Sequence, residues 1–91
     1  MSAMPTVFEA TLNTIYELSR RANRIREDSK CWKKYQDGSY EMALENEGYY
    51  TLRDTINTMK KRMMSGAHAS IEDLQRAEVL CKTLEIDLVR G

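Results

Sequence analysis

The residues best suited to catalysis are few and widely separated in this chain. His68 is the only histidine, and the two cysteines, Cys31 and Cys81, lie far apart in the sequence. Nucleophilic catalysis needs a base held beside a nucleophile, and no serine or cysteine can be placed next to His68 from its spacing. We therefore expect a surface histidine, two reduced cysteines and no enzymatic activity.

Metal and cofactor sites lack the residues that they need. Glu41, Glu45 and Glu47 resemble the carboxylates of metal-binding helices, but a di-iron bundle also requires Glu-x-x-His pairs, which this chain does not have. Its four glycines are scattered and form no phosphate-binding loop. The sequence therefore predicts no metal and no cofactor.

Composition favours one helical domain. Fourteen basic and fourteen acidic residues give a formal charge of zero, so nothing in the total favours nucleic acid or an anionic membrane. No apolar run approaches the roughly 18 residues of a membrane span, and residues 1–10 do not have the pattern of a secretory signal. One proline and four glycines leave long segments free of helix breakers. We expect a cytoplasmic, all-α protein.

Three helices are predicted from apolar periodicity, at about 5–35, 40–65 and 70–90. Short links make neighbouring helices antiparallel, so the expected fold is an up-down-up bundle: a long helical hairpin plus a shorter third helix. Gly48 either kinks the second helix or begins it. The three apolar seams consist of Phe8, Leu12, Ile15, Leu18, Ala22 and Ile25; Met42, Tyr49, Leu52, Ile56, Met59 and Met63; and Leu74, Ala77, Cys81, Leu84 and Leu88.

Helix ends are predicted from local signals. Thr6 with Glu9 has the form of a capping box, Ser70 suits an N-cap, and Gly66 suits a C-terminal cap. Methionines 59, 63 and 64 are expected to fill the core. Lys60, Lys61 and Arg62 are expected to meet Glu72 and Asp73 across the second link.

The stretch CWKKYQDGSYEM, residues 31–42, has two interpretations. Asp37-Gly38 is typical of a tight β-hairpin, but the alternation of polar and apolar residues fails, and a two-stranded ribbon alone is marginal in water. We therefore expect a bend that connects two helices. It should extend beyond the third helix and leave a cluster of aromatic and apolar residues for a partner protein, namely Trp32, Tyr35, Tyr40 and Met42. A small satellite core under the bend is the alternative.

A second apolar surface lies on the third helix. At 100° per residue, Val79 and Ile86 point almost opposite the seam, and Ile71 and Val89 flank them. A monomeric bundle would leave this stripe in water, which favours self-association. The function predicted is a small non-enzymatic protein–protein interaction module, such as an adaptor, an assembly component or an inhibitor.

Nucleic-acid binding is the alternative function. The segment 20–34 is rich in basic residues, and Trp32 and Tyr35 could stack on bases. The acidic residues of the predicted helix at 40–65 would partly neutralise this segment. The predicted helix at 70–90 carries too many acidic residues for a recognition helix. The candidate phosphate contacts are Arg20, Arg21, Arg24, Lys30, Lys33 and Lys34.

Overall fold

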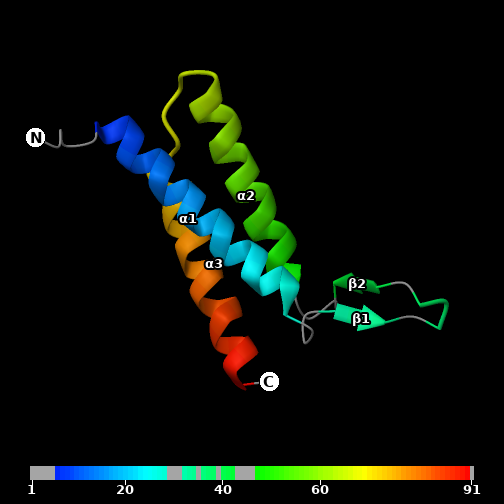
Figure 1. Ribbon diagram of the computed structural model, residues 1–91. Coiled ribbons are helices and arrows are strands. Elements are labelled where there is room, and N and C mark those ends of the chain that lie inside the picture. The colour runs from blue at the N-terminus through cyan, green and yellow to red at the C-terminus, as the bar shows by residue number, and fades with distance from the viewer. Residues whose placement is uncertain (1–5, 29–31, 35, 39, 43–46, 91) are drawn as a thin grey trace, which may run out of the picture.

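Three helices packed against one another make up the fold (Figure 1), which confirms the all-α class. The computed structural model describes residues 6–28, 32–34, 36–38, 40–42 and 47–90. The helices are α1 (Val7–Glu27), α2 (Glu47–Met64) and α3 (Ile71–Arg90). Two short strands, β1 (Trp32–Lys34) and β2 (Tyr40–Met42), lie between α1 and α2 in the chain.

The helix ends follow the predicted caps. Thr6 Oγ1 accepts a hydrogen bond from the Glu9 amide at 3.1 Å, and Ser70 Oγ accepts one from the Asp73 amide at 3.1 Å. Each cap satisfies an amide that has no partner within its helix. After α2, Gly66 adopts a positive φ of 88°, and the next amide, that of Ala67, returns to the Arg62 carbonyl at 2.9 Å. This left-handed turn ends the helix where the glycine predicted it.

The core lies along the seam where the three helices meet. Most of the predicted seam residues are buried, and Leu12 and Leu74 pack partly buried against them. Two expectations are wrong. Phe8 remains 38% exposed, and Met64 is 86% exposed because it follows Met63 by one position and therefore points away from the seam. The buried apolar residues are Ile15, Leu18, Ala22, Ile25, Tyr49, Leu52, Ile56, Met59, Met63, Ala69, Ala77, Cys81 and Leu84.

β1 and β2 form a β-hairpin, so the predicted helix connector is wrong. β1 pairs antiparallel with β2, with Trp32 opposite Met42, Lys33 opposite Glu41 and Lys34 opposite Tyr40. Gly38 has a φ of 86°, a conformation that glycine adopts without steric cost. The turn signal of Asp37-Gly38 therefore outweighed the missing alternation of polar and apolar residues.

The hairpin also shortens the first two predicted helices. The first ends at Glu27 instead of about residue 35, and the second begins at Glu47 instead of about residue 40. Asp28 is already extended, with a ψ of 128°. Gly48 lies in the first turn of α2, so it marks the start of that helix and not a kink.

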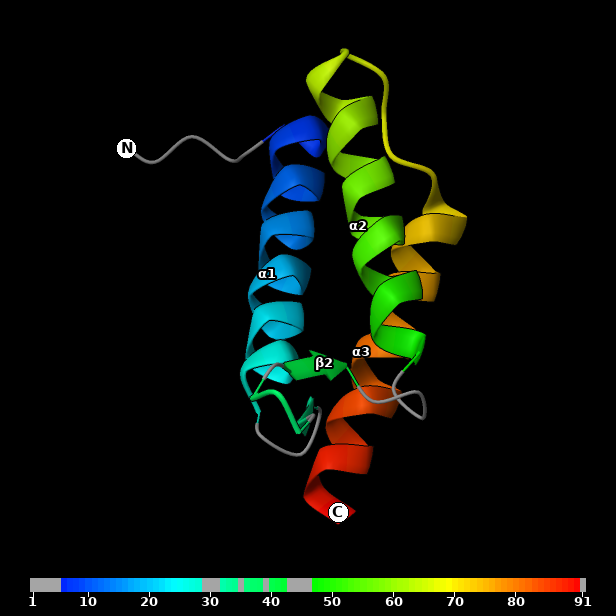
Figure 2. The same cartoon turned by 90° about the vertical axis from the view of Figure 1, so that its right-hand side faces the viewer.

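The hairpin projects sideways from the bundle, where α1 ends and α2 begins (Figure 1). The end of α3 continues past this level, so the expected extension of this segment beyond the third helix is wrong (Figure 2). The largest groups of contacts join the helices to one another and the two strands to each other. The molecule is elongated, with extents of 54 × 26 × 23 Å. Two separate surfaces, the sides of the bundle and the projecting hairpin, are therefore available for binding.

Candidate interaction surfaces

Arg21 joins α1 to α3 through two carboxylates. Its Nη1 donates to both carboxylate oxygens of Glu78 at 3.1 Å, and its Nε donates to Glu85 at 3.2 Å. A second bond to Glu85 completes a bidentate pair. The hydrogen bonds to Glu85 are the main reason that the pKa of Arg21 lies above its usual range, although burial opposes the shift. Arg21 therefore holds two helices together, and its side chain is only 19% exposed.

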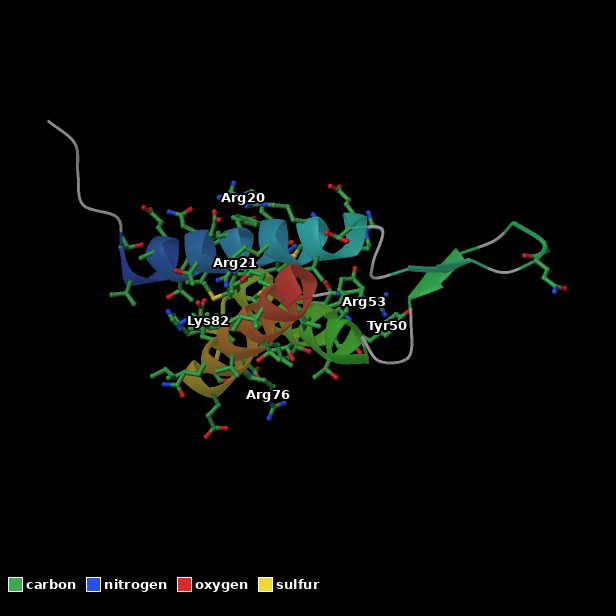
Figure 3. The ribbon with its side chains drawn as sticks, turned by 90° about the horizontal axis from the view of Figure 1, so that it is seen from below. Arg20, Arg21, Tyr50, Arg53, Arg76 and Lys82 are labelled. Carbon is green, nitrogen blue, oxygen red and sulfur yellow. The ribbon has the colours of Figure 1, made fainter. Side chains whose placement is uncertain are left out.

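Arg20 and Arg24 pair with a carboxylate on their own helix. Arg20 Nη2 lies 2.6 Å from Glu17, and Arg24 Nη2 lies 3.8 Å from the same carboxylate. The hydrogen bond from Arg20 is the largest cause of the lowered pKa of Glu17. Figure 3 shows Arg20 on the outer side of α1 and Arg21 between α1 and α3.

These pairs bear on the alternative function of nucleic-acid binding. Each of the three arginines already has a glutamate partner, and Arg21 faces another helix instead of solvent. A phosphate would have to displace these carboxylates. Lys30 lies outside the described residues, and Lys33 and Lys34 lie on β1, apart from the arginines on α1. Among the described side chains, Arg21 therefore turns toward α3, whereas Arg20 and Arg24 pair on α1, so these three arginines do not share one open phosphate-binding face.

His68 lies beside Thr11 near the second link. Its Nε2 is 3.2 Å from Thr11 Oγ1, and its Nδ1 is 3.1 Å from the Ala69 carbonyl oxygen. The Phe8 ring and the His68 imidazole lie edge to face, with their ring centres 6.3 Å apart. The Thr11 hydroxyl also donates to the Val7 carbonyl at 2.9 Å, a bond common for threonine inside a helix. These contacts attach the start of α1 to the link, and this threonine partner was not foreseen from the sequence.

Cys81 is a free thiol in the centre of the core. It is 0% exposed, and burial raises its pKa to about 11, against the opposing effect of Arg21. A thiol that is protonated at neutral pH and shielded from solvent is a poor nucleophile. Cys31 lies outside the described residues.

The outer face of α3 carries apolar side chains in water. Ile71 is 71% exposed, Val79 is 61% exposed and Ile86 is 51% exposed. Val79 also borders a shallow groove between α1 and α3 that Thr14 and Leu74 line. The side chain of Val89 is outside the described set. Three of the four predicted self-association residues thus form one exposed stripe.

The hairpin places three of the four predicted partner-binding residues at neighbouring positions. Trp32 and Met42 are direct cross-strand partners, and Tyr40 stands two positions from Met42 on β2. Tyr35 lies outside the described residues.

A polar groove that was not predicted from the sequence lies between α1 and α2. Its volume is about 350 Å³. Lys60, expected to meet Glu72 and Asp73, instead lies at this groove, where its Nζ donates to Ser19 Oγ at 3.0 Å. The polar residues of the lining are spaced by four and then three positions on both helices, a pattern from which this polar face could have been predicted. They are Ser19, Asn23 and Arg26 on α1, and Arg53, Asn57 and Lys60 on α2.

Comparisons with family models, with curated proteins and with solved structures found no match. In the part of the chain that the structure describes, no helix is long and apolar enough to cross a bilayer. Within the same residues, no three histidine, cysteine or acidic side chains are grouped so as to hold a metal ion. The functional argument therefore depends on the surfaces of this chain alone.

Proposed function

We propose that this chain is a small, non-enzymatic protein–protein interaction module of the adaptor, assembly-component or inhibitor kind. In this proposal it is an antiparallel up-down-up bundle, located in the cytoplasm, that associates with itself through α3 and binds a partner protein through the hairpin. The observation that carries the proposal is the exposed stripe of Ile71, Val79 and Ile86 on the outer face of α3.

The spacing of the stripe suits pairing with a second copy. Val79 stands eight positions after Ile71 and seven before Ile86, so it is close to the midpoint. A two-fold axis near Val79 would bring Ile71 of one copy opposite Ile86 of the other, with the two helices antiparallel. The stripe is about 22 Å long at about 1.5 Å per residue. Because this surface is small, the dimer should dissociate on dilution.

Analytical ultracentrifugation over a concentration series tests the self-association. The wild-type chain should gain mass with concentration, and Val79→Asp should remain monomeric because a carboxylate cannot be buried in that contact. Val7→Asp is the matched control, since Val7 is 75% exposed on α1 and lies outside the stripe. A wild-type chain that stays monomeric at all concentrations, or equal dissociation in both variants, contradicts the proposal.

The hairpin is the proposed surface for another protein. The two-stranded hairpin projects from the bundle (Figure 1), and aromatic residues are enriched at protein interfaces. Tagged protein would be used to recover partners from lysate of its native host, with and without nuclease. A stoichiometric partner that survives nuclease and is lost with Trp32→Ala, but not with Val7→Asp, is the expected result. Recovery that depends on nucleic acid would favour the alternative function instead.

A further inference from the structure

The groove between α1 and α2 carries a concentration of positive charge. Arg26, Arg53 and Lys60 line it, and among the described residues its lining includes no aspartate or glutamate. Ser19, Asn23 and Asn57 supply neutral polar groups between the cations.

Lys60 is the most informative of these cations. Its ammonium is held by Ser19 Oγ at 3.0 Å and lies 5.9 Å from the centre of the Tyr16 ring. Within the described part of the chain, no carboxylate comes within ion-pair distance of it. A half-buried ammonium held only by a hydroxyl and an aromatic face gains from an added anion.

Arg53, the other cation of α2 in the lining, lies about two helical turns away. Arg53 precedes Lys60 by seven positions on α2, which is about 10 Å along the helix. The Arg53 guanidinium stacks over Tyr50 at 5.2 Å from the ring centre, at the hairpin end of α2 (Figure 3). Its Nε is 3.7 Å from Asp54, whose side chain is 73% exposed and does not line the groove. An anionic ligand would therefore meet positive charge at two separate points.

This geometry distinguishes between classes of ligand. Arg53 and Lys60 start about 10 Å apart along α2, and their charged groups lie over different rings, Tyr50 and Tyr16, so in this structure they do not converge on one phosphate group. Single-stranded nucleic acid stacks its bases on open aromatic rings. Tyr49, in the lining, is only 5% exposed, and the exposed rings of Tyr16 and Tyr50 each already have a cation over one face. A volume of about 350 Å³ suits a few side chains and not a whole helix or duplex.

We propose that the α1/α2 groove binds an acidic helix of a partner protein, through two glutamates about two turns apart. One carboxylate would pair with Lys60 and the other with Arg53, because glutamates seven positions apart stand about 10 Å apart on one helix face. Asn23 and Asn57 would hydrogen-bond a polar side chain between them. This inference depends on the proposed role as an interaction module, and adds a second partner-binding surface and its chemistry.

An NMR titration of isotopically labelled protein tests the inference. The probe is an alanine-rich helical peptide with two glutamates seven positions apart, and the control is the same peptide with glutamines in their place. The glutamate peptide should shift the side-chain amide signals of Asn23 and Asn57. Arg53→Gln and Lys60→Gln should each raise Kd about tenfold, the effect of losing one good charge-assisted contact.

Two matched variants separate this site from general charge attraction. Lys61→Gln changes the exposed neighbour of Lys60, and Arg76→Gln removes an exposed arginine on α3, well away from Arg53 (Figure 3). Both should leave Kd within about twofold. Equal weakening in all four variants, or equal affinity for the glutamine peptide, would overturn the inference, as would an oligothymidylate that shifts the same amides while the glutamate peptide does not. The Val79→Asp monomer should titrate like wild type, so failure of self-association is distinguishable from failure of the groove.

Discussion

Replacing Arg21 with methionine should destabilise the bundle far more than the same change at its neighbour Arg20. Methionine keeps much of the aliphatic stem but removes the guanidinium, and with it four hydrogen bonds to Glu78 and Glu85. Arg20 is bonded only to Glu17 on its own helix, and both of those side chains are more than half exposed. The pair of variants therefore compares a link between helices with a surface ion pair.

The expected loss of stability follows from how far the three paired side chains are exposed to solvent. The Arg21 side chain is 19% exposed, and those of Glu78 and Glu85 are 41% and 40% exposed. Fully buried pairs cost about 3–5 kcal/mol to break and exposed pairs about 0–1 kcal/mol. Because the two glutamates can turn toward water, we expect about 1–2 kcal/mol for Arg21→Met. In a domain of this size that corresponds to a fall in Tm of roughly 4–16 °C.

Thermal unfolding followed by circular dichroism measures the effect. Arg21→Met should lower Tm within that range, whereas Arg20→Met should leave Tm unchanged within experimental scatter. Placing Arg21→Met in a Glu78→Gln, Glu85→Gln background should reduce its cost, because the carboxylates are no longer charged. Equal Tm values for Arg20→Met and Arg21→Met would refute the conclusion that Arg21 links α1 to α3.

Three further predictions concern stability. Gly48→Ala should raise Tm and increase the free energy of unfolding by up to about 1 kcal/mol, because the new Cβ would lie at an ordinary contact distance, 3.7 Å, from a methyl group of Leu84. Gly66→Ala should lower Tm, because the backbone φ of 88° at this position is strained for alanine. Met59→Ala should cost about 2–5 kcal/mol in a urea titration and Met64→Ala under about 0.5 kcal/mol, since their exposed fractions are 0% and 86%. Burial raises the pKa of Cys81 from 9.0 to about 11, so between these pH values the folded chain keeps a proton that the unfolded chain loses. The stability that the buried, protonated thiol contributes is complete below pH 9 and is lost as pH rises to about 11. Stability should therefore fall more steeply over that range in wild type than in Cys81→Ala, and parallel slopes would contradict a buried thiol.

Features that depend on nearby residues were predicted well. Thr6, Ser70 and Gly66 each act on a backbone group within a few positions, so the pattern alone indicated where helices begin and end. The seams were also predicted, because burial repeats with the helical period. The prediction that Met64 lies in the core was wrong, because it was made from the residue type alone. Its position on the helix, one residue after Met63, turns its side chain away from the seam.

Features that depend on which faces meet could not be predicted. The sequence shows that Lys60 is basic and near a link, but not that Ser19 on another helix would be its partner. Arg21 was likewise grouped with Arg20 and Arg24 as one basic face, although only Arg21 turns toward α3. The hairpin was missed because the failed alternation of polar and apolar residues was given more weight than Asp37-Gly38.

The hairpin between α1 and α2 also affects how freely this chain can vary. It projects from the bundle (Figure 1), and the buried core residues all lie outside its strands. Adding or removing one residue pair at a time, one from each strand, would change how far the hairpin reaches while leaving every helix–helix contact in place. Related chains could therefore exchange this segment for a longer, shorter or differently composed one, and so acquire a new partner, without redesign of the core.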